Sequence, residues 1–308
     1  MSDMARRQAD QALALRAEPA SGLDASRFNP SRDDDIQFEM FAVERPSIEQ
    51  IVAAGLAHNP VAKFAMFSSG DGSLAATHWA MNNVPGCEVL HINTGIGIER
   101  SRLFVRETCA REGWKLTEVR AKEDCGQDYE EIVAEHGFPG PGSHGLMYRR
   151  LKERCVELVV RQRKTARSDK VMLLTGICHD DSYRRSGYGG REITFKGAQM
   201  WVNHLYWAGQ SWRERYVASV SIPRNPVAVE LGMSGECLCG AFAGKGELRI
   251  VRRVCPATAD RIQALQHRIS NRHPWGWEDR PPRDRDLATP DFFAPMCVNC
   301  FKSERLAA

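Results

Sequence analysis

The sequence predicts an α/β protein in which a parallel sheet carries helices on both faces, followed by a small cysteine-rich C-terminal subdomain. Two observations carry this prediction. Along residues 47–231, short apolar runs of strand length alternate with stretches in which apolar residues recur at helical spacing, and such alternation is typical of parallel βαβ units. After Pro226 the pattern gives way to glycine clusters and close pairs of cysteines.

Three strands separated by helices are predicted in the first half of the chain. The run VAKFAMF at 61–67 is apolar and ends at SSGDGS, which indicates a buried strand followed by a turn. In chain order we expect a helix over 47–58, this strand, a helix over 73–81, a strand over 87–93, a helix over 99–112 and a strand over 114–119.

The second half continues the alternation and then loses it. The run KVMLLTGI at 170–177 predicts a fourth strand. We also expect helices over 129–136 and 146–163, a fifth strand over 200–205 and, within the cysteine-rich region, one helix over 258–269. The predicted organisation is an N-terminal arm or linker (1–46), a nucleotide-binding domain (47–231) and the cysteine-rich subdomain (232–308).

Composition excludes several classes of protein. Of the 308 residues, 43% are hydrophobic and 26% charged, which excludes a disordered or fibrous chain. A net charge of +3 is no signature of nucleic-acid or membrane binding. Because neither a signal peptide nor an apolar run of membrane-spanning length is visible, we expect a cytoplasmic protein without a membrane partner. In that compartment the ten cysteines suggest metal or redox chemistry rather than disulfides.

A phosphate-binding turn is the first candidate site. It follows the apolar run at 61–67 and precedes a predicted helix, where small residues let backbone N–H groups approach a phosphate and the helix start adds partial positive charge. An ordinary strand-to-helix turn favours the same residues. The candidate binding residues are Ser68, Ser69, Gly70, Gly72 and Ser73.

Two later strands end in similar polar loops. Thr94 and Gly95 follow the second strand, and Gly176 ends the fourth, followed by CHDDSYRR. Carboxyl ends of parallel strands meet at one sheet edge, so these loops are expected to face the phosphate turn. In the last of them we single out Ser182 and the phosphate-binding pair Arg184 and Arg185.

Four cysteines form two tight pairs, a C-x-C and a C-x₂-C. Four thiolates at such spacing fit tetrahedral Zn²⁺ or an iron–sulfur cluster. The metal candidates are Cys237, Cys239, Cys297 and Cys300, with Cys255 as a spare ligand.

Four motifs in this order resemble the phosphoadenosine phosphosulfate reductase-like family of the PP-loop (adenine nucleotide alpha hydrolase) superfamily. FSSGDGS (67–73) is similar to the S-G-G-K-D-S loop, and NTGIGIE (93–99) to the D-T-G-x-x-F-P-E-T segment. GICHDDSYRR (176–185) is similar to G-I-R-x-x-E-S-x-x-R, and IPRNPVAVELGMSGECLCGAF (222–242) to the tail of the cluster-bearing members. The resemblance spans about residues 61–300 and implies a Rossmann-like PP-loop fold.

The resemblance also implies site residues and cofactors. Ser68, Gly70 and Ser73 would hold a phosphate or sulfate of an adenine nucleotide, Thr94 and Gly95 would lie against the nucleotide, and Gly176, Ser182 and Arg185 would close the site. It favours a 4Fe–4S cluster over zinc at the four cysteines.

Departures from the family pattern keep the reaction open. Asp71 stands where the loop usually has Lys, so a bound phosphate would call for Mg²⁺, and the E-C-G-L-H tail of the reductases is missing. Cys178 replaces the Arg of G-I-R, and beside His179 it is either a thiolate nucleophile or a small residue ending the strand. Asp71 and Cys178 are the candidate catalytic residues.

Three functions remain. The first is a sulfonucleotide reductase, which takes electrons from a thiol or an electron-donor protein. The second is an ATP-dependent sulfurtransferase that modifies a nucleic acid, as in DNA phosphorothioation or tRNA thiolation. The third is a catalytically inactive nucleotide-binding protein.

Overall fold

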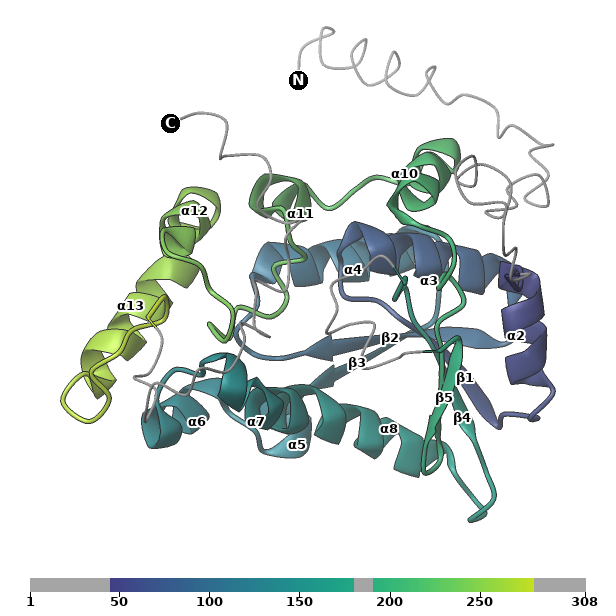
Figure 1. Cartoon of the computed structure of the whole chain (residues 1–308), viewed down its shortest axis with the longest axis horizontal. Coiled ribbons are helices and arrows are strands. Elements are labelled where there is room, and N and C mark those ends of the chain that lie inside the picture. Colours follow the sequence, from purple (N-terminus) through teal and green to yellow (C-terminus); the bar gives the residue numbers. More distant parts are fainter. Residues whose placement is uncertain (1–44, 180–190, 280–308) are drawn as a thin grey trace, which may run out of the picture.

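The computed structural model describes residues 45–179 and 191–279, and Figure 1 shows the arrangement of these parts. Nearly all of the predicted N-terminal arm lies outside the described residues, as do Ser182, Arg184, Arg185, Cys297 and Cys300. The expected α/β architecture is confirmed: a six-stranded, mostly parallel sheet is covered by helices on both faces.

The sheet has the strand order β3-β2-β1-β4-β6-β5. All neighbouring strands run parallel except β5, which pairs antiparallel with β6 at the edge. The strands are β1 (Ala62–Met66), β2 (Cys87–Asn93), β3 (Leu116–Arg120), β4 (Val171–Leu174), β5 (Ile193–Lys196) and β6 (Gln199–Val202). The five predicted strands are therefore present, and the hairpin strand β5 is an addition.

Helices lie on both faces of this sheet. One face carries α2 (Ile48–Leu56), α3 (Asp71–Asn83), α4 (Glu99–Arg111) and α10 (Gln210–Ser219), and the other carries α5 (Ala121–Cys125), α6 (Tyr129–His136), α7 (His144–Tyr148) and α8 (Arg154–Arg163). A short 3₁₀ turn (Pro141–Ser143) precedes α7. The C-terminal region adds α11 (Pro226–Leu231), α12 (Glu247–Val254) and α13 (Pro256–Ile269).

Side-chain caps mark the start of two of these helices. Ser47 caps α2 through a capping box with Gln50, and Asp128 caps α6 by accepting the Glu130 N–H. The predicted helix over 146–163 is a continuous helical stretch with a π-helical turn at Arg149–Glu153 between α7 and α8. Such turns insert one extra residue and are frequent near functional sites.

The C-terminal region packs onto the sheet. Leu238, Cys239 and Trp277 belong to the same hydrophobic cluster as Phe64 of β1 and Leu173 of β4. The prediction of one helix after residue 232 was wrong, since α12 also forms there. α12 is a short amphipathic helix, with Val251 and Val254 buried and two arginines in its last turn. The spacing of apolar residues had not predicted it. None of the described helices is long and apolar enough to cross a membrane.

Candidate nucleotide and sulfur site

The candidate site lies where the strand order reverses. β1 and β4 are neighbours in the sheet although they are far apart in the chain, and the loops that follow them leave the same edge. Ligands of open α/β sheets bind at such a position. The loops are in close backbone contact, because a Cβ added to Gly176 would lie 2.3 Å from the carbonyl oxygen of Gly72. The structure therefore brings these two predicted residues together.

The phosphate turn is held in shape by its own serines. Ser69 has a left-handed backbone (φ +65°), and Gly70 is the N-cap residue of α3. The Ser73 hydroxyl donates to the carbonyl of Gly70 at 2.8 Å and accepts the N–H of Ser68 at 3.2 Å. The turn thus presents small residues at the positive end of a thirteen-residue helix.

Two arginines from outside the turn bring positive charge to it. The guanidinium of Arg224 contacts both carboxylate oxygens of Asp71, with Nε at 3.1 Å from Oδ1. Arg213 of α10 lies beside Gly72, since a Cβ on that glycine would be 3.0 Å from its Nη1. Two arginine side chains therefore lie beside the acidic residue of this turn.

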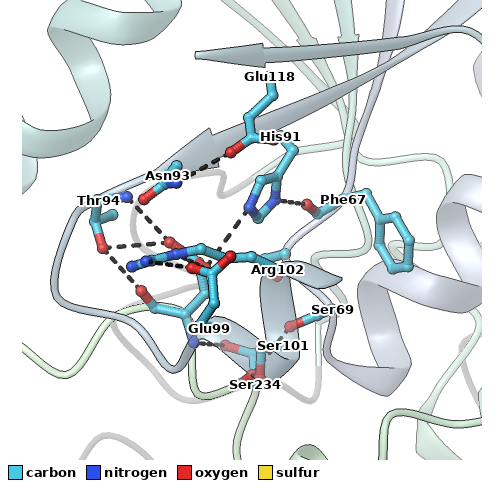
Figure 2. Close-up of polar contacts among 12 residues, drawn as sticks. Phe67, Ser69, His91, Asn93, Thr94, Glu99, Ser101, Arg102, Glu118 and Ser234 are labelled. Atoms are coloured by element: carbon cyan, nitrogen blue, oxygen red, sulfur yellow. Dashed lines mark hydrogen bonds and ion pairs between the residues drawn. The ribbon is translucent and has the colours of Figure 1, made fainter. Parts of the chain in front are cut away.

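The turn also holds the segment that leads into the C-x-C pair. The hydroxyls of Ser69 and Ser101 both donate to the carbonyl of Ser234, at 3.0 and 2.9 Å (Figure 2). The buried Asn225, which caps α11, donates to the Ser69 carbonyl and to the Ser101 hydroxyl. Ser234 is three residues before Cys237, so the phosphate turn and the cysteine pair belong to one assembly.

Glu236, next to the pair, joins this segment to the loop after β2. Its side chain is 3% exposed and accepts the Thr94 N–H at 3.0 Å, while the Thr94 hydroxyl donates to the Glu236 backbone carbonyl at 2.8 Å. A Cβ on Gly97 would lie 2.4 Å from that same carbonyl oxygen. Thr94 is therefore fully buried, and the carbonyl of neighbouring Gly95 accepts from Arg261 at 2.6 Å.

Two buried side chains that carry nitrogen atoms face the Glu236 carboxylate. His91 Nε2 and Arg102 Nε lie 3.6 and 3.4 Å from its Oε2, longer than hydrogen bonds. The other His91 nitrogen, Nδ1, donates to the carbonyl of Phe67 at 2.8 Å (Figure 2). Burial raises the pKa of Glu236 above its usual value, against the opposing positive charge of His91 and Arg102.

Around this cluster lies a more exposed ion-pair network. Arg106 donates to both carboxylate oxygens of Glu118 at 2.8 Å, and Asn93 donates to the same carboxylate at 3.0 Å. These bonds lower the pKa of Glu118 to about 2, the Arg106 bond contributing most. Glu99 adds contacts to Arg102 and Arg106. The network holds α4 against the ends of β2 and β3.

The C-x-C thiols lie side by side. The Cys237 and Cys239 side chains are hydrogen bonded to each other, and this contact together with burial raises the pKa of Cys239 well above its usual value. Backbone bonds fix the pair, as Tyr129 Oη donates to the Cys239 carbonyl and Trp277 Nε1 to the Leu238 carbonyl. Two adjacent thiols fit half of a four-thiolate metal or cluster site.

The remaining ligands of such a site are not among the residues described. Residues 45–179 and 191–279 contain no group of three or more His, Cys, Asp or Glu side chains that could hold a metal ion. The spare candidate Cys255 lies 3.2 Å from the Thr258 hydroxyl. Cys297 and Cys300 fall outside the described chain, so their role stays a prediction.

Cys178 occupies a core position. Its side chain is fully buried among apolar residues, and its thiol donates to the carbonyl of Leu205 at 2.9 Å. A reaction at this thiol requires a movement that exposes it. Burial also raises the pKa of both Cys87 and Cys109 to about 12, as expected of structural cysteines.

A separate basic cavity lies at the opposite end of the sheet. It measures about 620 Å³ and lies between the end of α8 and the turn from β5 to β6. Its lining includes the cations Arg161, Lys164, Arg167 and Lys196. Because it lies beyond the amino ends of β4 and β6, it is not part of the candidate site.

Sequence reasoning missed the residues that connect the loops. Glu236, His91, Arg102 and Arg224 were not singled out, although Arg224 and Glu236 lie inside the quoted 222–242 segment. A buried acid directly before a C-x-C pair was the available signal. No sequence signal pointed to His91 and Arg102, because their contact with Glu236 joins distant parts of the chain.

Comparisons with known proteins found similar solved structures, but no family or curated relative. No protein-family model matches the chain, and no curated protein matches it. A solved structure of a phosphoadenylyl-sulfate (PAPS) reductase from Candida auris, in a phosphate complex, matches with 14% identity and a TM-score of 0.45, over 60% of this chain and 85% of that one. The U34-tRNA thiolase NcsA from Methanococcus maripaludis, with its [4Fe-4S] cluster, matches with 12% identity and a TM-score of 0.40, over 72% of this chain and 80% of that one.

Proposed function

We propose that this protein is an adenine-nucleotide-dependent enzyme of sulfur chemistry, with the nucleotide phosphates at the 68–73 turn and the reacting sulfur close to the C-x-C pair. One observation carries the proposal: Ser69 of the phosphate turn is hydrogen bonded to Ser234, three residues before Cys237. A phosphate-binding turn and a pair of thiols are therefore held together at the strand reversal, where α/β sheets bind ligands.

The turn and its arginines suit a phosphate or sulfate group. Backbone N–H groups at the start of α3 favour an anion, and the guanidinium groups of Arg213 and Arg224 can make paired hydrogen bonds to its oxygens. Asp71 contacts Arg224, and its carboxylate is a ligand of the kind that Mg²⁺ prefers. A nucleotide that binds together with Mg²⁺ would thus find arginines for its negatively charged phosphates and a carboxylate for the metal ion.

The four cysteines are proposed to hold a 4Fe–4S cluster, with zinc as the alternative. Cys237 and Cys239 would supply two ligands, and Cys297 and Cys300 the other two. A cluster supplies electron transfer or a sulfur-binding iron, whereas zinc would make the site structural. The side-by-side thiols support either metal.

Sulfonucleotide reduction is the leading reaction, because the segments after β2 and β4 resemble those of the reductases. A thiol would attack the sulfonate sulfur and displace the adenosine phosphate, which forms a thiol S-sulfonate. Two electrons from an external thiol or electron-donor protein would then cleave its S–S bond and release sulfite, with oxidation of the donor. The missing E-C-G-L-H tail and the cysteine pair beside the phosphate turn favour a second candidate, an ATP-dependent sulfurtransferase acting on a nucleic acid. In either case we place the enzyme in the cytoplasm.

The test combines binding with turnover on anaerobically purified protein. ATP, adenosine phosphosulfate and 3′-phosphoadenosine phosphosulfate are titrated by calorimetry, and sulfite, AMP and pyrophosphate are measured as products. Arg224→Met removes a cation from the turn, while Arg252→Met removes one from a comparable exposed ion pair with Asp260. Charged hydrogen bonds contribute roughly 1.5–3 kcal/mol, so Arg224→Met should weaken nucleotide binding about tenfold or more.

Each result decides between the candidates. Sulfite release with a thiol donor supports the reductase, and AMP or pyrophosphate release that needs a nucleic-acid acceptor supports the sulfurtransferase. Binding without turnover supports an inactive nucleotide-binding protein. No binding of any nucleotide, or equal binding by the Arg224→Met and Arg252→Met variants, contradicts the proposed site.

A further inference from the structure

A buried charged cluster lies between the phosphate turn and the cysteine pair, and its members are His91, Arg102 and Glu236. Their exposed fractions are 0, 7 and 3%. Polar and charged groups buried this deeply cost free energy unless they are paired, so the shape of the surrounding loops depends on their mutual contacts. None of the three touches the turn's phosphate-binding surface directly.

Polar atoms of this cluster point at one another without completing hydrogen bonds. Among the described residues, His91 Nε2, Arg102 Nε and Nη2, and Glu236 Oε2 are buried and have no hydrogen-bond partner. The Glu236 oxygen is nevertheless 3.6 Å from His91 Nε2 and 3.4 Å from Arg102 Nε. Electrostatic attraction between these groups is strong because they are buried away from water. A small displacement of one group therefore changes the energy of the others.

The cluster is linked to the phosphate turn by a hydrogen bond and to the C-x-C pair by a peptide bond. His91 Nδ1 donates to the carbonyl of Phe67, the residue before the phosphate turn. Glu236 is the residue before Cys237, and its carboxylate also holds the Thr94 N–H. A continuous path therefore runs from the phosphate turn through His91 and Glu236 to the C-x-C pair.

A second contact joins the phosphate turn to the segment before the cysteine pair. Ser69 donates to Ser234, and a Cβ on Gly70 would lie 3.3 Å from the Ser234 Cβ, so the turn and the 234–237 segment are packed against each other. A structural change caused by ligand binding at the turn would thus reach the 234–237 segment through two separate contacts. The path through Glu236 is the one that ends next to the thiols.

We propose that Glu236 is a positioning residue that couples nucleotide occupancy of the phosphate turn to the reactivity of Cys237. The proposal rests on the nucleotide site proposed above. Nucleotide binding orders the carbonyl of Phe67, His91 keeps its hydrogen bond to that carbonyl, and the Glu236 carboxylate follows His91. Cys237 is thereby held in one geometry when a nucleotide is present.

The test variant is Glu236→Gln, which keeps the size of the side chain and an oxygen that accepts from Thr94 but removes the charge that faces His91 and Arg102. His91→Gln is a second variant, whose amide can donate to the Phe67 carbonyl without presenting the imidazole Nε2 to Glu236. The matched control is Glu247→Gln. Glu247 is a buried glutamate that accepts the Gly244 N–H at 2.8 Å and lies in α12.

The measurement is the alkylation rate of Cys237 by iodoacetamide in the full-length protein after a chelator has removed any bound metal anaerobically, because a metal-bound thiolate is protected from alkylation. The modified peptide is quantified by mass spectrometry. Rates are taken without nucleotide and with saturating ATP or adenosine phosphosulfate, whose binding is measured separately by calorimetry. A purely structural role of Glu236 would change stability and both rates, but not their ratio. In the wild type and in Glu247→Gln, nucleotide should slow alkylation at least threefold, while in Glu236→Gln and His91→Gln the ratio should fall to about 1.

The outcomes separate this inference from the proposed function. A wild-type ratio that persists in the two test variants overturns the coupling role, because direct shielding by the nucleotide would then explain it. A wild-type protein that binds nucleotide with a ratio of 1 also overturns the coupling role and leaves the nucleotide site standing. Absence of nucleotide binding in calorimetry overturns both.

Discussion

Gly97→Ala tests whether the loop after β2 and the 234–237 segment are packed as closely as the structure indicates. The added Cβ would lie 2.4 Å from the carbonyl oxygen of Glu236 and 2.8 Å from its carbonyl carbon and Cα. These are backbone atoms, which cannot rotate away, and ordinary contact begins near 3.4 Å. The two backbones must therefore separate by roughly 1 Å.

The cost of that separation can be estimated from two terms. Overpacking of a well-packed interior costs typically about 1–3 kcal/mol. The Thr94 hydroxyl also loses its 2.8 Å bond to the same Glu236 carbonyl, which adds about 1 kcal/mol. We expect Gly97→Ala to lower the free energy of unfolding by about 2–4 kcal/mol and to weaken nucleotide binding.

Urea unfolding followed by circular dichroism measures the change, together with calorimetry of ATP binding. Gly145→Ala is the control, because a Cβ there meets no atom within 4 Å on an exposed part of α7. This variant should match the wild type or gain up to about 1 kcal/mol. If Gly97→Ala differs from Gly145→Ala by less than about 0.5 kcal/mol, the close approach of the two segments is refuted.

Two further changes test the ion-pair network and the metal site. The depressed pKa of Glu118, about 2 against an ordinary 4.5, means that its stabilising effect is complete above about pH 4.5 and is lost as the pH falls toward 2. Glu118→Gln should therefore lower the free energy of unfolding by about 2 kcal/mol at neutral pH, after allowance for the partly exposed Arg106. The difference from wild type in urea unfolding should shrink on acidification. A difference that is independent of pH contradicts this assignment. Cys237→Ser or Cys297→Ser should abolish the binding of iron and sulfide, or of zinc, measured on anaerobically purified protein. Cys178→Ser should retain the metal, because Cys178 is buried in the core away from the pair. Retention of full metal content by Cys297→Ser contradicts the four-cysteine site.

Regular elements were predictable where local sequence determined them. β2 and α6 were predicted with the bounds that the structure has, because the first is a short apolar run and the second begins at a capping aspartate. β5 was missed, since ITFK alternates weakly and is an exposed edge strand whose only sheet partner is β6. Its formation depends on the hairpin turn at Gly197, which has a left-handed backbone (φ +61°).

The candidate site was predictable in part. The phosphate turn and Gly176 could be found because chemistry and topology placed them at strand ends, and the structure brings Gly72 and Gly176 together. The Glu236 contacts could not be found, because they join residues more than 130 positions apart. Thr94 shows the difference: the motif predicts a residue against the nucleotide, whereas its N–H and hydroxyl are bound to Glu236.

A crystal structure of the anaerobically purified protein with a bound adenine nucleotide examines the proposed site most directly. We predict that the phosphate or sulfate group lies at the backbone N–H groups of residues 70–73 within reach of Arg213 and Arg224, and that Cys237 and Cys239 ligate a metal in the same crevice. Phosphate density in the basic cavity around Lys164 and Arg167, with side chains filling the space above the 68–73 turn, would contradict it.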